Sequence, residues 1–219
     1  MKESELVSVM NRHLKDNGLL YANEIRMGIG IPDIMVGCHV PEEHENIMDY
    51  YALKLYYLIV DNNIKSISEA AEKSVLTKNH LLRCIRILAD SKIIKVIDER
   101  ITVTKRIDDN NLGVNVSIEV KIKDWKGGLV QAQRYLCFSD YSYVALPENT
   151  VKSVDIDKFT ESGIGLLGVA DDCIYEVIKP FKSTECDHLF KYISISTMLE
   201  KNEDIVISSN SDDRIFSVI

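Results

Sequence analysis

Hydrophobic and polar positions alternate most regularly over residues 114–122. One face of this predicted strand is entirely apolar: Val114, Val116, Ile118, Val120 and Ile122. The other face is entirely polar: Asn115, Ser117, Glu119 and Lys121. Because successive side chains of a strand point to opposite sides, we expect the apolar face to pack on a helix. The polar face then carries a carboxylate and an ammonium group side by side, and the simplest interpretation is a solvated ion pair.

The remaining apolar spacings predict alternating helices and strands. Helices are predicted over 3–16, 128–138, 154–161 and 184–200. Strands are predicted over 19–27, 31–37, 141–146, 164–169 and 173–179. This alternation indicates an α/β fold in which helices flank a mixed sheet.

The segment 46–106 has a different pattern. Three predicted helices precede two strands: 49–61, 69–74 and 78–90, then 93–97 and 101–104. Ser68 and Thr77 are expected to cap the second and third helices. This order of elements resembles the winged helix-turn-helix family.

Composition and charge limit the binding partners and the cellular compartment that we expect for this chain. The chain has 219 residues and a net charge of −8, but residues 46–108 carry +3 and the remainder carries −11. Nucleic acid is therefore expected to bind the middle segment, if it binds at all. The apolar runs are too short for a membrane span, and the polar start MKESELVSVM leads us to expect no secretory signal. Five cysteines without a CxxC pair favour a reduced, cytoplasmic protein.

Several short motifs occur in a meaningful order outside the middle segment. An aspartate opens an apolar strand in IPDIMVG (31–37), and Glu119-Val120-Lys121 lies on the alternating strand. QAQRY (131–135) follows on a helix, and YSYVALP (141–147) forms the next strand. Residues 3–37 and 114–147 therefore resemble the PD-(D/E)xK, or restriction-endonuclease-like, nuclease superfamily.

The resemblance implies a metal-dependent site. Asp33 and Glu119 would bind Mg²⁺ or Mn²⁺, and the backbone carbonyl of Val120 would supply a further ligand. Lys121 would position the attacking water or stabilise the transition state, and Gln131 would orient Lys121 or contact the nucleic-acid backbone.

Two more carboxylates are candidate ligands. The family often has a glutamate on its first helix, which here is Glu5, with Glu3 as a less favoured choice. An acidic residue at a helix N-terminus is equally explained by the helix dipole. Glu24 either reaches the metal or forms an ion pair with Arg26.

Asp33 and Glu119 are 86 positions apart, whereas the family usually joins these two strands by a short connection. An inserted domain accounts for the separation. We therefore predict a discontinuous nuclease-like core, 1–45 with 107–219, and an inserted winged helix over 46–106. Residues 108–113 are expected to form the return turn.

The inserted module is expected to contact DNA through its third helix and its wing. The residues assigned to this surface are Lys78, Asn79, His80, Arg83, Arg86, Lys95 and Arg100. Winged helices also bind proteins, so a protein partner is the alternative.

The combined expectation is a Mg²⁺-dependent nuclease that hydrolyses DNA phosphodiester bonds. The alternatives are a catalytically inactive DNA-binding regulator and a protein-interaction adaptor on the same fold. Cleavage of both strands of a duplex by one site per chain would call for a homodimer.

Overall fold

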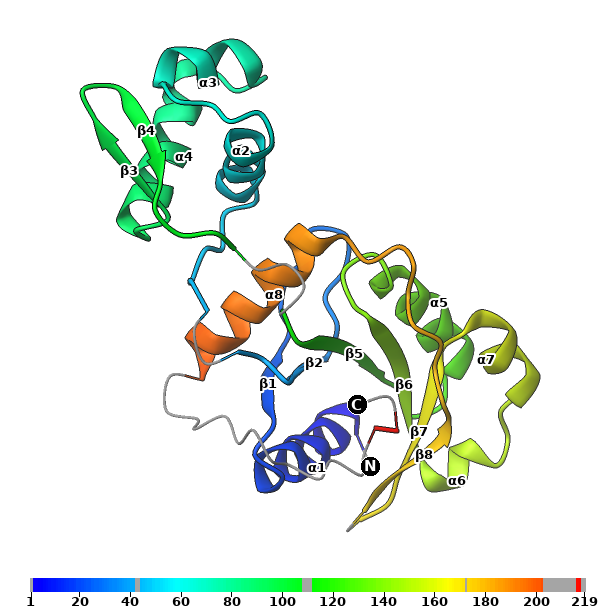
Figure 1. Ribbon diagram of the computed structural model, residues 1–219. Coiled ribbons are helices and arrows are strands. Elements are labelled where there is room, and N and C mark those ends of the chain that lie inside the picture. Colours follow the sequence, from blue (N-terminus) through cyan, green and yellow to red (C-terminus); the bar gives the residue numbers. More distant parts are fainter. Residues whose placement is uncertain (1, 42–43, 108–111, 172, 203–215, 218–219) are drawn as a thin grey trace. The chain divides into compact units, whose positions relative to one another are not determined.

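The computed structural model describes residues 2–41, 44–107, 112–171, 173–202 and 216–217. The chain divides into two compact units (Figure 1), Met1–Glu42 with Asn111–Ile219, and Glu43–Asn110. The return turn predicted at 108–113 falls largely on 108–111, which lie outside the described residues.

The larger unit is built on a six-stranded mixed sheet with the order β1-β2-β5-β6-β7-β8. Its strands are β1 (Leu20–Asn23), β2 (Ile34–Cys38), β5 (Val114–Val120), β6 (Tyr141–Pro147), β7 (Gly165–Val169) and β8 (Ile174–Ile178). The β5–β6 and β6–β7 pairs are parallel, and the other three pairs are antiparallel. Parallel neighbours need a crossover, and helices supply it on both sides of β6.

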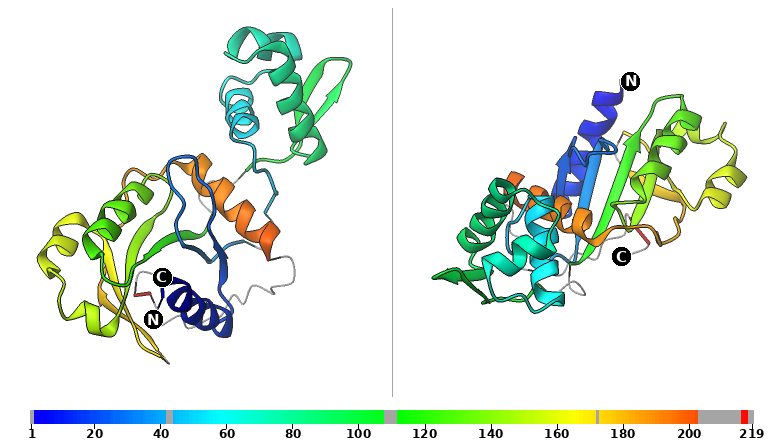
Figure 2. Two further views of the ribbon diagram at one scale, coloured as in Figure 1. Left: turned by 180° about the vertical axis from the view of Figure 1, so that it is seen from behind. Right: turned by 90° about the horizontal axis from the view of Figure 1, so that it is seen from above.

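Helices cover both faces of this sheet, so the predicted α/β class with a helix-flanked mixed sheet is confirmed. The helix α1 (Glu3–Asp16) buries Leu6, Met10 and Leu14 against one face. The opposite face is covered by α5 (Trp125–Tyr135), α7 (Ile156–Ser162) and α8 (His188–Lys201), while the short α6 (Glu148–Val151) follows β6. Figure 2 shows α1 and α5 on opposite sides of the sheet.

The polar face of β5 is buried, which corrects the expectation of a solvated face. Asn115 and Ser117 are fully buried, and Glu119 is nearly so. Each finds a polar partner: Asn115 donates to Ser194 Oγ of α8 at 2.6 Å, and Ser117 and Ser142 share a hydrogen bond of 2.9 Å. A central strand flanked by parallel and antiparallel neighbours is covered on both sides, so polar residues there need partners within the protein.

The smaller unit contains three helices and a hairpin. They are α2 (Tyr50–Asp61), α3 (Ile67–Lys73), α4 (Lys78–Asp90), β3 (Ile94–Ile97) and β4 (Arg100–Val103). Thr77 caps α4 as predicted, whereas α3 is capped by Ser66 and not by Ser68. Ser66 is the residue with extended backbone before the helix, which is the conformation that capping requires.

Two predicted boundaries in the larger unit are wrong for local reasons. The strand expected over 19–27 ends at Asn23, because Glu24 adopts a left-handed backbone conformation with φ 51°. The helix expected over 128–138 begins at Trp125, because the Asp124 side chain accepts from Gly127 N and caps it. No helix among the described residues is long and apolar enough to cross a membrane.

Gly113 occupies a position that excludes a side chain. Its φ is +74°, and a Cβ atom built there would lie 2.5 Å from the Cys38 carbonyl oxygen. Gly113→Ala is therefore expected to lower the free energy of unfolding by at least about 2 kcal/mol, measured by urea denaturation. Gly28→Ala is the matched control, because Gly28 has a φ of +80° with nothing within 4 Å of the built atom. It should cost only about 1 kcal/mol, and equal losses would contradict the steric argument.

Candidate active site

The register of β2 against β5 brings Asp33 to Glu119. The strands are antiparallel with Ile34 opposite Ile118, so Asp33, just before β2, meets the end of β5. Asp33 Oδ2 accepts a hydrogen bond of 2.7 Å from the Val120 amide. Residues 87 positions apart along the chain are thereby joined directly.

Glu119 lies at the centre of this cluster. Its side chain is only 2% exposed, and that of Lys121 is 17% exposed. Lys121 Nζ donates to Glu119 Oε1 at 2.6 Å. The Tyr135 hydroxyl donates to Glu119 Oε2 at 2.7 Å and has the Ile31 carbonyl oxygen as a second neighbour at 3.2 Å. Both carboxylate oxygens are therefore held in place by donors.

The helix α5 closes the cluster because glycine lets it approach β5. A Cβ atom at Gly128 would lie 3.0 Å from Lys121 Cγ, so the stem of Lys121 packs against the helix. Gln131 and Tyr135 follow at helical spacings of three and seven residues and share this face of α5. The structure therefore places Gln131 between the residue that packs on Lys121 and the residue that binds Glu119.

Burial and charge shift the acid–base properties of the cluster. Burial is the largest influence on Asp33 and, with the charge of Glu119, raises its pKa to about 6, although the Val120 amide opposes this rise. Burial lowers the pKa of Lys121, but the hydrogen bond and charge of Glu119 outweigh it, so that the pKa is raised overall. Burial, together with Glu119, also raises the pKa of Tyr135. Lys121 is a stable cation here, and Tyr135 is a stable hydrogen-bond donor.

The additional carboxylates fall in different environments. Glu3, at the start of α1, is close enough to raise the pKa values of both Asp33 and Lys121. The Glu5 carboxylate accepts from the Lys2 amide at 2.8 Å and caps the same helix. Glu24 is exposed, and its amide donates to the Asp33 carbonyl oxygen at 3.2 Å. The charge of Glu3 therefore contributes to the electrostatics of Asp33 and Lys121, while the Glu5 carboxylate caps the helix that carries both glutamates.

The donor set suits a hard divalent cation. Asp33 and Glu119 are two carboxylates whose mutual repulsion a cation would relieve, and oxygen ligands are those that Mg²⁺ and Mn²⁺ prefer. The described residues contain no cluster of three or more His, Cys, Asp or Glu side chains that could hold a metal. Two carboxylates with several waters is a common arrangement for Mg²⁺, so the set fits without a third side chain.

The residues predicted to contact DNA lie on the smaller unit. Lys78, Asn79, Lys95 and Arg100 are exposed. Arg83 forms an ion pair with Asp49, and Arg86 lies 3.8 Å from Asp90. The His80 ring packs against the Tyr51 ring, with centroids 4.7 Å apart. Two of the predicted cations are therefore partly neutralised by neighbours, and His80 is engaged with α2.

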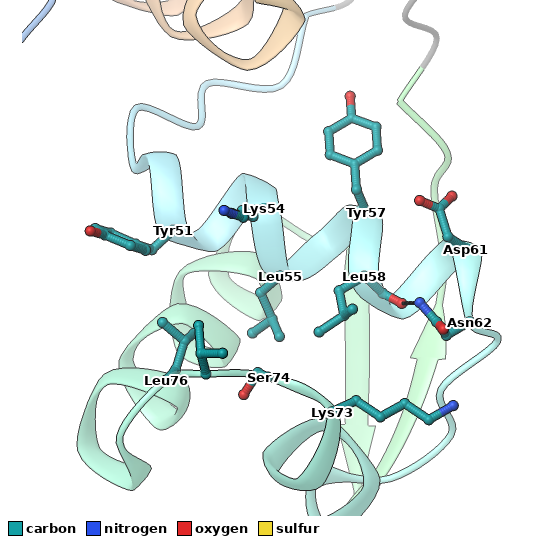
Figure 3. Close-up of a pocket in the computed structure, with 11 residues that line it drawn as sticks. Tyr51, Lys54, Leu55, Tyr57, Leu58, Asp61, Asn62, Lys73, Ser74 and Leu76 are labelled. Atoms are coloured by element: carbon teal, nitrogen blue, oxygen red, sulfur yellow. Dashed lines mark hydrogen bonds between the residues drawn. The ribbon is translucent and has the colours of Figure 1, made fainter.

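The smaller unit also carries a groove of about 460 Å³ (Figure 3). The helix α2 and the turn between α3 and α4 form its walls. Leu55, Leu58 and Leu76 line its apolar part, and Lys54 and Lys73 lie at its margins. None of the predicted site residues lines it.

The contact between Tyr135 and Glu119 was not predicted from the sequence. The signal was present, because Tyr135 follows Gln131 by one helical turn and so shares its face. The link between Glu3 and Asp33 was also missed, since Glu5 was favoured over Glu3.

Comparisons with known proteins identify no relative from which a function could be assigned to this cluster. No protein-family model, curated protein or solved structure matches the chain.

Asp33→Asn tests the electrostatic account of the cluster. Because the folded state holds the Asp33 proton up to a pH of about 6, this stabilising contribution is present at low pH and is lost as the pH rises through 6. Asparagine can still accept from Val120 N but carries no charge. The variant should therefore unfold with a free energy about 1 to 3 kcal/mol higher than that of the wild type at pH 8 in EDTA.

The gain should shrink as the pH falls to 5, as measured by urea denaturation at both values. The gain is the free energy of unfolding of the variant minus that of the wild type. A gain that is no larger at pH 8 than at pH 5 would contradict the assignment. Glu24→Gln, a change at an exposed carboxylate nearby, serves as the control.

Proposed function

We propose that this protein is a metal-dependent nuclease of the PD-(D/E)xK type that hydrolyses DNA phosphodiester bonds. The observation that carries the proposal is the hydrogen bond from Val120 N to Asp33, which joins Asp33 to Glu119 and Lys121 at one point. The proximity of an aspartate, a glutamate and a lysine supports the assignment of these residues to one site. The α1-β1-β2-β5-α5-β6 order of elements also agrees with the proposal.

In this proposal each residue has a separate task. Asp33 and Glu119 would hold the divalent cation, which when bound would supply a water of lowered pKa and offset charge on the phosphate. Tyr135 and Lys121 fix the two oxygens of Glu119, so that this ligand needs little reorganisation. Lys121 donates to Glu119 and is partly exposed, so its ammonium would orient the attacking water or stabilise charge that develops on the phosphate.

Gln131 completes the arrangement from α5. Its position between Gly128 and Tyr135 suits a contact with the Lys121 amine or with a phosphate oxygen. The raised pKa of Asp33 means that protons and metal compete for this carboxylate. Metal affinity and cleavage should therefore fall together below a pH of about 6.

Lys121→Ala tests the hydrolytic role directly. The variant should cleave plasmid or labelled oligonucleotide at least about 100-fold more slowly than the wild type with Mg²⁺ or Mn²⁺. The reason is that it lacks the lysine ammonium group next to the reacting phosphate. Its affinity for DNA should change little. The measurement is the initial rate of nicking, with EDTA abolishing it in the wild type.

Lys123→Ala is the matched control, since Lys123 is an exposed lysine two residues further along. It should retain the wild-type rate, and circular dichroism should show both variants folded. Equal rates for wild type and Lys121→Ala would reject the assigned role. A wild type that binds DNA without cutting it under any of these conditions would instead favour the inactive regulator.

We further propose that the smaller unit is a winged helix that contacts DNA. Three capped helices followed by a hairpin support this interpretation, as does the exposure of Lys78 and Lys95 on α4 and β3. The ion pair of Arg83 with Asp49 is on the surface, where such pairs contribute little and can be exchanged for a phosphate.

Lys78→Ala/Lys95→Ala should therefore weaken DNA binding and make it less dependent on salt. Two lost phosphate contacts would reduce the slope of log affinity against log salt by up to about 2. Fluorescence anisotropy over a salt series measures both quantities. Lys54→Ala/Lys73→Ala, which removes two lysines at the groove, is the control, and an equal effect from it would contradict a specific surface.

A further inference from the structure

The connection between β1 and β2 is a loop whose two ends are joined by a hydrogen bond. The Glu24 amide donates to the Asp33 carbonyl oxygen at 3.2 Å and ties the two ends together. A second bond of 3.0 Å, from Met27 N to the Gly30 carbonyl oxygen, forms the tip, where Gly28 has a φ of +80°. Compact loops with joined ends often carry function.

The hydrophobic side chains of this loop differ in solvent exposure. Ile25 and Met27 are buried and anchor the loop to the core. Ile29 and Ile31, by contrast, are 55% and 45% exposed. These two isoleucines lie two positions apart in a loop of ten residues and leave apolar surface in water next to Asp33.

The exposed isoleucines are fixed to the candidate active site. Gly30, between them, lies on the Tyr135 ring, where a Cβ atom would be only 2.6 Å from Cε1. The Ile31 carbonyl oxygen lies 3.2 Å from the hydroxyl that binds Glu119. Asp33 is two residues beyond Ile31, so the backbone distance between them is at most about 7 Å.

We infer that Ile29 and Ile31 form an apolar wedge against an unpaired base, so that the DNA accepted at this site is single-stranded or melted beside the scissile phosphodiester. The inference rests on the proposed nuclease function and specifies its substrate. A phosphodiester held at Asp33 would lie close to Ile31, because the backbones of these two residues are at most about 7 Å apart.

The chemistry of the loop distinguishes unpaired from paired DNA. The outer surface of a duplex presents mainly phosphates, and the base faces are stacked inside. Arg26 is the only cation among residues 24–33, so the loop is expected to contribute through its isoleucines more than through phosphate contacts. Unpaired bases expose their faces, and an isoleucine side chain that packs against such a face removes apolar surface of both groups from water.

The test compares Ile29→Ser/Ile31→Ser with the wild type on one labelled strand, presented alone or in a blunt duplex. The wild type should cleave and bind the single strand at least about 10-fold better than the duplex. The double variant should lose about 10-fold in affinity and rate on the single strand, with little change on the duplex. Ile156→Ser is the matched control, because Ile156 is 44% exposed on α7, and it should behave as the wild type.

Binding is measured by anisotropy in EDTA, cleavage is measured with Mg²⁺, and thermal melting verifies that each variant is folded. Unchanged single-strand binding and cleavage in the double variant would overturn the wedge while leaving the nuclease proposal intact. Isoleucine-dependent binding without any cleavage by the wild type would support the wedge and reject the nuclease proposal. A change of oligomeric state confined to the double variant, seen by sedimentation, would assign the isoleucines to self-association and overturn the inference.

Discussion

The hydrogen bond from the Val120 amide to Asp33 is the contact on which the candidate site depends. It extends the contact between β2 and β5 beyond the last pair, Ile34 and Ile118, and uses the Asp33 side chain in place of a backbone carbonyl. This bond holds Asp33 beside Glu119, at a cost that is visible in the raised pKa of Asp33. A stable sheet thus keeps together two carboxylates that would separate in water.

The two carboxylates at this contact differ in burial and in the number of hydrogen-bond donors that hold them. Glu119 is buried and has donors on both oxygens, whereas Asp33 is more accessible and has a pKa near 6. Lys121 balances one of the two negative charges. The site therefore combines a carboxylate held by two donors with one whose pKa lies near 6, and both are oxygen donors of the type that the proposed divalent cation requires. Tyr135 connects this electrostatic arrangement to the loop that carries Ile29 and Ile31, so that the proposed chemistry and the proposed substrate surface share one side chain.

Much of the secondary structure could be predicted from local patterns. Strict alternation identified β5, the spacing of Leu6, Met10 and Leu14 identified α1, and Thr77 marked the start of α4. Such features depend on residues a few positions apart. Glu24 and Asp124 show the limit, because one left-handed residue and one cap moved boundaries that periodicity alone had placed elsewhere.

The sequence by itself determined the α/β class, the residue types of the cluster and the apolar face of β5. Only the tertiary structure decided that the polar face of β5 is also buried, that Tyr135 binds Glu119, and that Glu3 has an electrostatic link to Asp33. The physical reason is that periodicity reports which side chains share a face but not what covers that face. Burial, hydrogen-bond partners and pKa values arise from elements far apart in the chain, and these elements meet only when the sheet and its helices have assembled.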